Sequence, residues 1–340
     1  MLVVTRERPL PPEPIEPHLI VADTLFEHSN ATAAPFIHTN GNDIYFVESD
    51  RITKKTRQGE EVWQTPLREM TEDMIVVPNG EFIGIRESGS NTFYVIDGQG
   101  EIQRTQLVHP ILALAINEKG YAAIYVQGEE GYKIYVVDQM GELIFDTFLT
   151  DGHILPMILS FSGNIVALSV GDISLLEVQT SVMFIDIEQG LIGHTPWLSD
   201  IVYNMTFYSG DLFVTHNDGI KVVDVNSLEV IWQREQNVDN VFFTEGFVVL
   251  QDGDRLNTIT KQNEDIGSYT IDAGTVTYLN VSHGYIIIGI NREFYALNSE
   301  GDRVWSFVTV GQPIELSMLE DTSYAILKTE VEVSLLKRIG

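Results

Sequence analysis

Short apolar segments alternate with glycine-containing turns along almost the whole chain. Ile134–Asp138, for example, is followed by Gly141 and then by Glu142–Phe145. The segments are rich in Val, Ile, Tyr and Phe, which favour pleated strands. Asp or Asn followed within a few residues by Gly is typical of a hairpin turn, because Gly accepts positive φ. The same pairing recurs at Phe93–Asp97 with Glu101–Gln103, Lys221–Asp224 with Leu228–Trp232, and Phe294–Asn298 with Val304–Trp305. The pattern predicts consecutive antiparallel strands.

These pairs belong to a repeated unit of four short strands. The first strands of the copies begin near residues 33, 71, 109, 152, 200, 237, 274 and 311, so the spacings are 38, 38, 43, 48, 37, 37 and 37 residues. Four-stranded sheets repeated at a nearly constant spacing indicate a β-propeller. We therefore predict an all-β protein with antiparallel four-stranded blades.

The last copy supplies only three strands before the chain ends. They are Pro313–Leu319, Ser323–Lys328 and Val331–Leu336. An unassigned strand, His18–Leu25, precedes the first copy. If it is the outer strand of the last blade, it closes the ring and protects an edge that would otherwise template aggregation. This arrangement predicts an eight-bladed propeller with an N-terminal closing strand. Seven blades, with one degenerate copy outside the ring, is the alternative.

Residues 1–17 differ from the rest because they hold five of the twelve prolines. Proline fixes φ and removes a hydrogen-bond donor, so we expect an extended, semi-rigid spacer. Residues 18–340 are then a single propeller domain. A spacer of this kind suggests that a membrane anchor precedes it, and a disordered native tail is the other interpretation. No apolar run reaches the roughly 18 residues of a membrane span.

Composition narrows the possible partners. The chain has 20 Lys and Arg against 49 Asp and Glu, a net charge of −29. This argues against nucleic-acid binding, which needs a basic patch, and against docking on an anionic membrane. There is no cysteine, which excludes disulfides, thiolate metal sites and cysteine nucleophiles.

The fourth-strand pattern of Gly, apolar residues and Trp resembles the quinoprotein-like (PQQ-like) propellers. Gly59 with Trp63 and Gly301 with Trp305 carry it, and Trp232 lies at the equivalent place. In those propellers Trp locks neighbouring blades together. The chain also resembles an uncharacterised family of bacterial membrane-anchored propellers. The segments that carry this likeness are Pro110–Leu114, Gly120–Ala123, Gly131–Asp138, Gly152–Leu155, Ala167–Ser169 and Ser181–Ile187.

The second resemblance implies a location outside the cytoplasm of a Gram-positive bacterium, with an N-terminal membrane helix. A cytoplasmic location is the alternative. The resemblance to this family supplies no functional residues. Quinone catalysis is not expected, because the resemblance to those enzymes is confined to the blade signature, and they commonly use adjacent cysteines, a Ca²⁺ site and a catalytic Asp. We therefore expect no cofactor.

Metal and catalytic motifs are also weak. His109 and His153 both lie where a first strand begins, and two blades could bring them together with Asp151; ordinary loop or channel-lining residues are the simpler interpretation. Asp252–Gly253–Asp254 resembles part of a calcium loop but lacks the later carboxylates, so we expect a plain hairpin turn. We assign no catalytic or metal-binding residue.

The loops that join consecutive blades form the candidate binding face, because loops on a rigid scaffold commonly carry recognition. This set is acidic and includes one Trp, a residue enriched in binding hot spots. The insertion Gly171–Thr180 in the fourth blade lengthens a loop on the same face, and folding back on its own blade is the alternative to a partner contact. The candidates are His109, Asp151, His153, Trp197, Asp200, Asp239 and Asp272, with Asp172 and Glu177 of the insertion; Glu69, Met70 and Asp73 also lie in these loops.

Three functional hypotheses follow. The first is a monomeric, non-enzymatic scaffold or ligand-binding module whose loop face binds a protein or cell-wall partner. The second is an enzyme of hydrolase or lyase type with its site in the central funnel. The third is a sensor domain that signals through an N-terminal helix.

Overall fold

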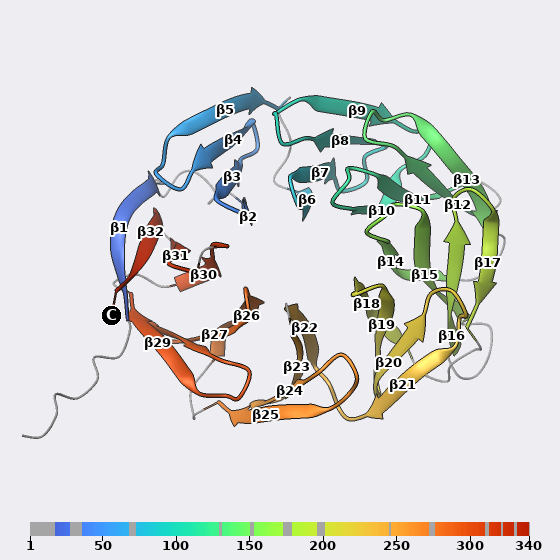
Figure 1. Cartoon of the computed structure of the whole chain (residues 1–340). Helices are drawn as coiled ribbons and strands as arrows, with labels where there is room; N and C mark the ends of the chain where they lie inside the picture. Colours follow the sequence, from blue (N-terminus) through green and yellow to red (C-terminus); the bar gives the residue numbers. More distant parts are fainter. Residues whose placement is uncertain are drawn as a thin grey trace, which may run out of the picture.

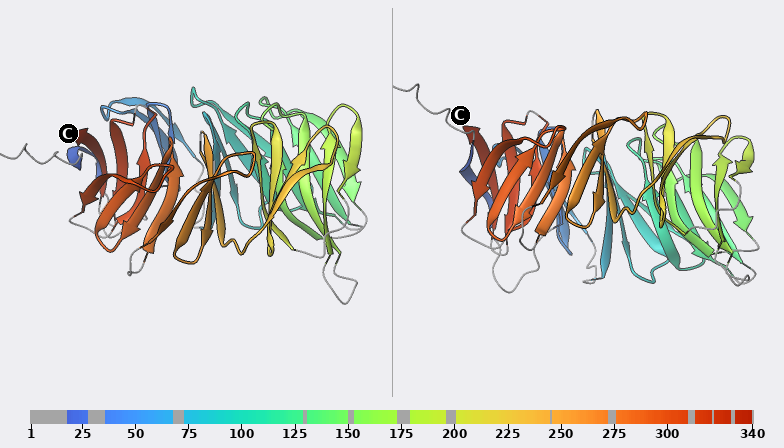
Figure 2. Two further views of the ribbon diagram at one scale, coloured as in Figure 1. Left: turned by 60° about the horizontal axis from the view of Figure 1, so that its bottom comes forward. Right: turned by 90° about the horizontal axis from the view of Figure 1, so that it is seen from below.

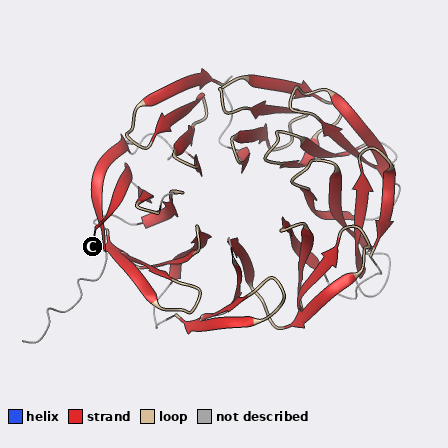
Figure 3. Ribbon diagram, in the orientation of Figure 1, coloured by secondary structure: helices blue, strands red, loops and turns tan. Residues whose placement is uncertain are grey.

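The protein forms a ring of four-stranded sheets around a central axis (Figure 1). The computed structural model describes residues 18–27, 36–67, 73–128, 131–149, 153–172, 179–195, 201–244, 246–271, 276–309, 313–320, 322–329 and 332–339. Strands and their turns make up this described part, and no helix occurs in it (Figure 3). The prediction of an all-β chain is confirmed.

Each of the first seven blades contains four strands in the order of the chain, from the centre of the ring outward. Blades 1 to 4 contain β2 (Phe36–Asn40), β3 (Asp43–Val47), β4 (Arg51–Thr56) and β5 (Glu61–Pro66); β6 (Met74–Asn79), β7 (Phe82–Glu87), β8 (Thr92–Ile96) and β9 (Ile102–Gln106); β10 (Ile111–Ile116), β11 (Ala122–Gln127), β12 (Tyr132–Val137) and β13 (Leu143–Leu149); and β14 (His153–Leu159), β15 (Ile165–Asp172), β16 (Gln179–Asp186) and β17 (Gly190–His194).

The second half of the ring repeats this arrangement and ends in a composite blade. Blades 5 to 7 contain β18 (Val202–Tyr208), β19 (Asp211–His216), β20 (Gly219–Asp224) and β21 (Val230–Glu235); β22 (Asn240–Thr244), β23 (Phe247–Asp252), β24 (Arg255–Ile259) and β25 (Asp265–Thr270); and β26 (Val276–Ser282), β27 (Tyr285–Ile290), β28 (Glu293–Leu297) and β29 (Arg303–Val308). Blade 8 contains β30 (Pro313–Met318), β31 (Tyr324–Thr329), β32 (Glu332–Ile339) and β1 (His18–Glu27).

The two ends of the chain close the ring, as the sequence predicts. β1 pairs antiparallel with β32 from His18 opposite Ile339 to Glu27 opposite Glu332, and so becomes the outer strand of blade 8. One further bridge, His18 opposite Ser306, ties β1 to the outer strand of blade 7. The propeller therefore has eight blades, and the seven-bladed alternative is wrong.

The strands run between two faces of a disc (Figure 2). The connections between consecutive blades and those between second and third strands lie on one face, which we call the loop face; residues 107–110 are an example. The connections between first and second and between third and fourth strands lie on the other, which we call the turn face; residues 97–101 are an example. β1 begins at His18 on the turn face, beside the end of β32.

The core is divided among the seams between blades. The described residues form eight buried clusters, and each joins residues of two neighbouring blades. Between blades 1 and 2, for instance, Tyr45 and Ile52 pack against Ile83 and Ile96. Burial of these strands on both faces explains their near-continuous apolar sequences and makes the ring a single packed body.

Tryptophans tie two of these seams together at the rim. Trp63 in β5 donates its indole N–H to the carbonyl of Gly98, 3.1 Å away in a turn of blade 2. Trp232 in β21 makes the same contact with Lys261 of blade 6 at 2.8 Å. Both acceptors lie in the turn that joins the third and fourth strands of the next blade, so the expected locking role is observed at these two positions.

Trp305 differs, although it lies at the same place in β29. Its side chain is buried between blades 7 and 8, and its indole N–H has no partner among the described residues. The third and fourth strands of blade 8 come from opposite ends of the chain. Blade 8 therefore lacks the tight turn whose carbonyl accepts this hydrogen bond elsewhere.

Candidate functional site

The loop-face mouth of the channel exposes apolar side chains that the inner strands present. In β10, the register shifts between Ile111 and Ala113, so that Leu112 has no partner in β11. The same shift occurs at Tyr203 in β18 and at Ile314 in β30. A bulge of this kind turns the extra side chain away from the regular pleat. Leu112, Tyr203 and Ile314 are therefore 44%, 42% and 42% exposed, although the residue two positions further along each strand is buried.

Further exposed apolar residues lie at or just before the start of the inner strands. They belong to blades 1, 2, 3, 5 and 8 or to the segments that enter these blades from the loop face, and we call them together the apolar collar: Phe36, Ile75, Val108, Leu112, Ile201, Tyr203 and Ile314. Contiguous exposed apolar surface on a soluble protein marks a contact site more often than single scattered residues do.

Arg86 fixes the collar at blade 3. Its guanidinium, in β7, is buried and donates to the carbonyls of Ile111 and Leu112 at 3.2 and 2.8 Å. These are carbonyls of the bulge, which the β10–β11 ladder does not satisfy in the regular way. Burial lowers the pKa of Arg86 below its usual value. The two hydrogen bonds of the guanidinium therefore hold the backbone of Leu112 in position.

Tyr203 links the collar to the next blade. Its hydroxyl donates to the carbonyl of Val238, which directly precedes Asp239. Burial raises the pKa of Tyr203, and the nearby Asp239 charge acts in the same direction. The Asp239 carboxylate accepts a hydrogen bond from the backbone N–H of Gly253 at 2.7 Å. Both side chains are thus held in place at the mouth.

The collar is hollowed beside His109. A cavity of about 350 Å³ lies between the loop that enters blade 3 and the end of β11. It is lined by His109, Pro110, Leu112, Gln127 and Gly128. A cavity of this size takes a side chain or a short apolar segment.

The surroundings of the collar are acidic. Exposed aspartates on the loop face of the described chain are Asp50, Asp73, Asp218, Asp239, Asp252 and Asp254. Among the cations of this face, Arg51 is held by Glu48 at 2.7 Å. The mouth therefore combines apolar contact surface with a rim of negative potential.

The predicted site residues are described unevenly. His109 and Asp239 lie on the loop face, in the cavity and beside the collar respectively. His153 and Asp172 are described only as backbone positions in β14 and β15. The grouping of His109 with His153 and Asp151 stays a prediction. Outside the described residues lie Asp151, Trp197, Asp200, Asp272, Glu177, Glu69 and Met70.

The insertion in blade 4 is shorter as a loop than the sequence indicates. Gly171 pairs with Thr180 and Asp172 pairs with Gln179, so both ends extend the β15–β16 hairpin. The expected loop Gly171–Thr180 is wrong in its bounds, because pairing continues beyond the usual strand length. Asp252–Gly253–Asp254, by contrast, forms the plain hairpin turn that the sequence predicts, because Asp252 pairs with Arg255 and the two residues between them make the turn.

Sequence reasoning missed a polar cluster in the channel wall between blades 7 and 8. The Tyr278 hydroxyl donates to the carbonyl of Leu316 at 3.0 Å, and burial raises the pKa of Tyr278 to about 12. Burial also raises the pKa of the Glu315 carboxyl. It lowers the pKa of Lys328, which pairs across the strands with Glu315. The signal available in the sequence was the pair of opposite charges, Glu315 and Lys328, on the first and second strands of the last blade.

Two kinds of feature are absent from the described residues. No group of three or more His, Asp or Glu side chains there is placed to hold a metal ion. No helix in that part is long and apolar enough to cross a membrane.

The fold and the collar define an eight-bladed β-propeller with a recessed apolar mouth. Residues 22–333 match the family described as "Family of unknown function (DUF5711)", and the chain belongs to that family. A comparison with curated protein sequences finds no match.

Solved structures share the fold at low identity. BamB from Moraxella catarrhalis is 12% identical with a TM-score of 0.59, covering 92% of this chain and 99% of its own. The C-terminal WD40 domain of Sif2 is 11% identical with a TM-score of 0.65, covering 95% and 99%. The dihydro-heme d1 dehydrogenase NirN is 11% identical with a TM-score of 0.61, covering 95% and 79%. At these identities the likeness concerns the fold alone.

Proposed function

We propose that this propeller is a non-enzymatic scaffold that binds a polypeptide partner at the loop-face mouth. The observation that carries the proposal is the apolar collar inside an acidic rim. The partner segment inserts apolar side chains into the mouth and carries Lys or Arg beside them. The apolar contacts supply affinity, and the opposite charges steer the approach.

We place this scaffold outside the cytoplasm of a Gram-positive bacterium, held by an N-terminal membrane anchor. The support is the resemblance to anchored propellers and the proline-rich composition of residues 1–17. The first described residue of β1, His18, lies on the turn face. A tether there leaves the collar facing away from the membrane. The chain acts as a monomer, and its relation to PQQ-like propellers is one of blade construction.

A peptide titration tests the partner chemistry. A short labelled peptide of leucines flanked by lysines is compared, by fluorescence anisotropy, with the same peptide carrying glutamates. We expect the double variant Leu112→Asp with Ile314→Asp to weaken binding of the lysine peptide at least tenfold, roughly 1.4 kcal/mol. The control is Leu143→Asp, since Leu143 is 56% exposed on the outer strand β13, away from the channel.

The outcomes separate cleanly. Loss of binding in the collar variant with retention in the β13 variant, at unchanged thermal stability, supports the proposal. Equal binding of the glutamate peptide, or equal loss in both variants, contradicts it.

The channel-wall cluster favours a second candidate, a hydrolase or lyase. A carboxyl group whose pKa is raised, beside a lysine whose pKa is lowered, is the kind of pair that transfers protons. Turnover of ester, lactone or glycoside probes that Glu315→Gln abolishes and the β13 variant Leu143→Asp retains would favour this candidate.

A further inference from the structure

A polar groove lies on the flank of the disc at the seam between blades 5 and 6, and it reaches the loop face at Asp252 and Arg255. It separates the outer strand of blade 5 from the sheet of blade 6 and has a volume of about 440 Å³. Blade 5 contributes Arg234 and Gln236, and blade 6 contributes Asp252, Arg255, Asn257 and Ser268. Two arginines in one groove are notable in a chain with 20 Lys and Arg against 49 acidic residues.

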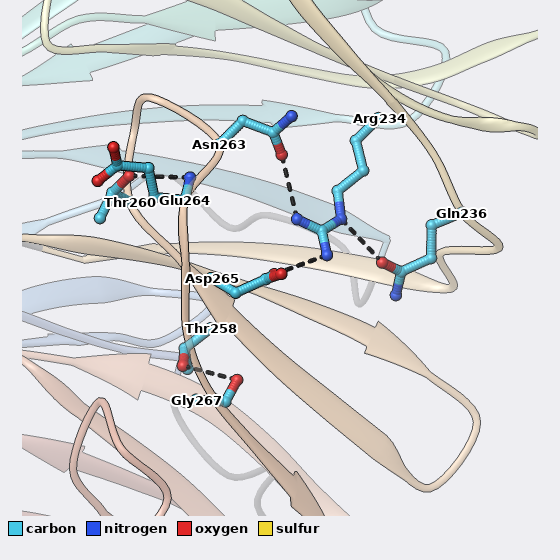
Figure 4. A network of polar contacts seen from close by, with 8 residues as sticks. All are labelled: Arg234, Gln236, Thr258, Thr260, Asn263, Glu264, Asp265 and Gly267. Carbon is cyan, nitrogen blue, oxygen red and sulfur yellow. Dashed lines mark hydrogen bonds and ion pairs between the residues drawn. The ribbon is translucent and has the colours of Figure 1, made fainter.

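Arg234 is fixed in one orientation (Figure 4). Its Nη2 donates to Asp265 at 2.7 Å, its Nη1 to Asn263 at 3.1 Å, and its Nε to Gln236 at 3.1 Å. Asp265 neutralises its charge. These three contacts use three of the five N–H donors of a guanidinium, so the group is pre-organised and retains donors for a ligand.

Arg255 is different, because within the described chain no oxygen accepts a hydrogen bond from its side chain. The same position of blade 1 holds Arg51, whose Nε and Nη2 donate to Glu48 at 2.7 and 3.1 Å. The equivalent of Glu48 is Asp252, which is shorter by one methylene and makes no ion pair with Arg255 in the described structure. Arg255 and Asp252 therefore leave one free positive and one free negative charge in the groove.

We propose that this groove is a second binding site and that its ligand is a small zwitterion, an α-amino acid or a short peptide. The carboxylate of the ligand binds Arg255, whose planar fork matches two carboxylate oxygens. The ammonium group binds Asp252. The donors that remain on Arg234, with Asn257 and Ser268, hold the neighbouring polar atoms. This site is independent of the collar.

The experiment is a calorimetric titration of the full chain at low salt. The probes are L-alanine, tri-L-alanine, N-acetyl-tri-alanine and tri-alanine amide. We expect one zwitterion to bind with a Kd near or below about 1 mM, and blocking either terminus to weaken binding at least tenfold. L-alanine and tri-L-alanine separate a free amino acid from a peptide as the source.

Two variants and a matched control complete the test. Arg255→Ala and Asp252→Asn each lower the affinity at least tenfold, whereas Arg51→Ala, at the equivalent place in blade 1, leaves it unchanged. Binding that survives Arg255→Ala, binding that ignores both blocking groups, or no binding by any probe up to about 10 mM overturns the proposal. Arg255→Ala leaves both the apolar collar and its acidic rim unchanged, so the outcome of that variant does not bear on the scaffold function.

Discussion

Two seams, between blades 1 and 2 and between blades 5 and 6, share the same tryptophan contacts, which we call the frame. They differ in the side chains at the neighbouring positions, which we call the filling. In both, a tryptophan of the outer strand donates to a turn carbonyl of the next blade. In both, its ring stands edge-on to an aromatic ring of the second strand, Tyr45 for Trp63 and Phe213 for Trp232. The frame follows from the repeat, because equivalent strands place equivalent residues opposite one another.

The fillings differ at two positions of the register. Opposite its tryptophan, blade 1 has the buried Lys54 and blade 5 has Val222. Lys54 donates to the carbonyl of Gly98 at 3.1 Å and pairs with Asp43 at 2.7 Å. Thr65 then donates to the carbonyl of Gly100 at 2.8 Å, whereas Arg234 occupies its place in β21.

The comparison shows how a repeat frees some positions for other roles. A short threonine closes the first seam directly on the backbone of the neighbouring turn. The longer arginine spans the second seam to side chains and borders an open groove. An arginine in place of threonine at this one equivalent position thus borders a candidate binding site where the first seam has a structural contact.

The tryptophans should give the largest effect. We expect Trp63→Ala to lower the free energy of unfolding by roughly 2–4 kcal/mol, because it removes ring packing and leaves the Gly98 carbonyl with Lys54 alone. Trp232→Ala should cost about 1 kcal/mol less, since its hydrogen bond is exposed. Urea denaturation measures both losses of unfolding free energy. A larger loss in Trp232→Ala than in Trp63→Ala would contradict this prediction.

Replacing Lys54 by the valine of the other seam tests the polar filling. Lys54→Val should cost roughly 1–3 kcal/mol at pH 7, because Asp43 and the Gly98 carbonyl lose a charged donor. Burial acts to lower the pKa of Lys54, but its hydrogen bond to Asp43 and its contact with Tyr45 raise the pKa overall; burial also raises the pKa of Tyr45.

The pKa of Lys54 is raised in the folded state, so the stabilisation that its charge supplies is complete below the unfolded value and is lost as the pH rises through the folded one. Wild-type protein should lose more stability than Lys54→Val above about pH 10. If the free energy of unfolding of both proteins falls equally with rising pH in this range, the charge of Lys54 does not make the stability of this seam depend on pH.

The turn glycine gives a third effect of about 1–3 kcal/mol. Gly100 has φ near +83°, and a Cβ there would lie 2.8 Å from Trp63 Cδ2 and 2.9 Å from Thr65 Oγ1. Gly100→Ala should therefore destabilise through strain and overpacking. Asn263, at the equivalent turn position, already adopts φ 69°. Asn263→Gly should change stability by less than about 1 kcal/mol, and thermal unfolding compares the two.

Arg234→Thr should have the smallest effect on stability, under about 1 kcal/mol, because Asp265 is largely exposed and screened. The same variant should weaken zwitterion binding, since the groove loses its fixed guanidinium. Unchanged affinity, measured by calorimetry beside the stability assay, would confine Arg234 to a structural role.

The architecture was predictable because it depends on patterns that repeat. Strand alternation, Asn or Asp before Gly, and the spare strand His18–Leu25 predict the eight blades and their closure. The tryptophans were visible for the same reason.

The contents of the sites were not predictable from the same patterns. Leu112 reads as one apolar residue of a strand, and only the bulge in the β10–β11 register exposes it. The correspondence of Thr65 with Arg234 likewise requires the cross-strand register. The loop face was predictable, with His109 and Asp239 on it, but the residues predicted there were mostly acidic, together with Trp197 and Met70, and did not include the exposed apolar residues of the collar.

Site-specific photo-crosslinking tests the collar as a docking site most directly. A photoreactive residue is placed at Leu112 or, as the control, at Leu143, and each protein is irradiated with host envelope extract. The account predicts one polypeptide joined through position 112 and absent at 143, which then binds the purified wild-type propeller and fails to bind the Leu112→Asp, Ile314→Asp variant. A partner joined only through position 143, or one that binds the collar variant as tightly as the wild type, would contradict it.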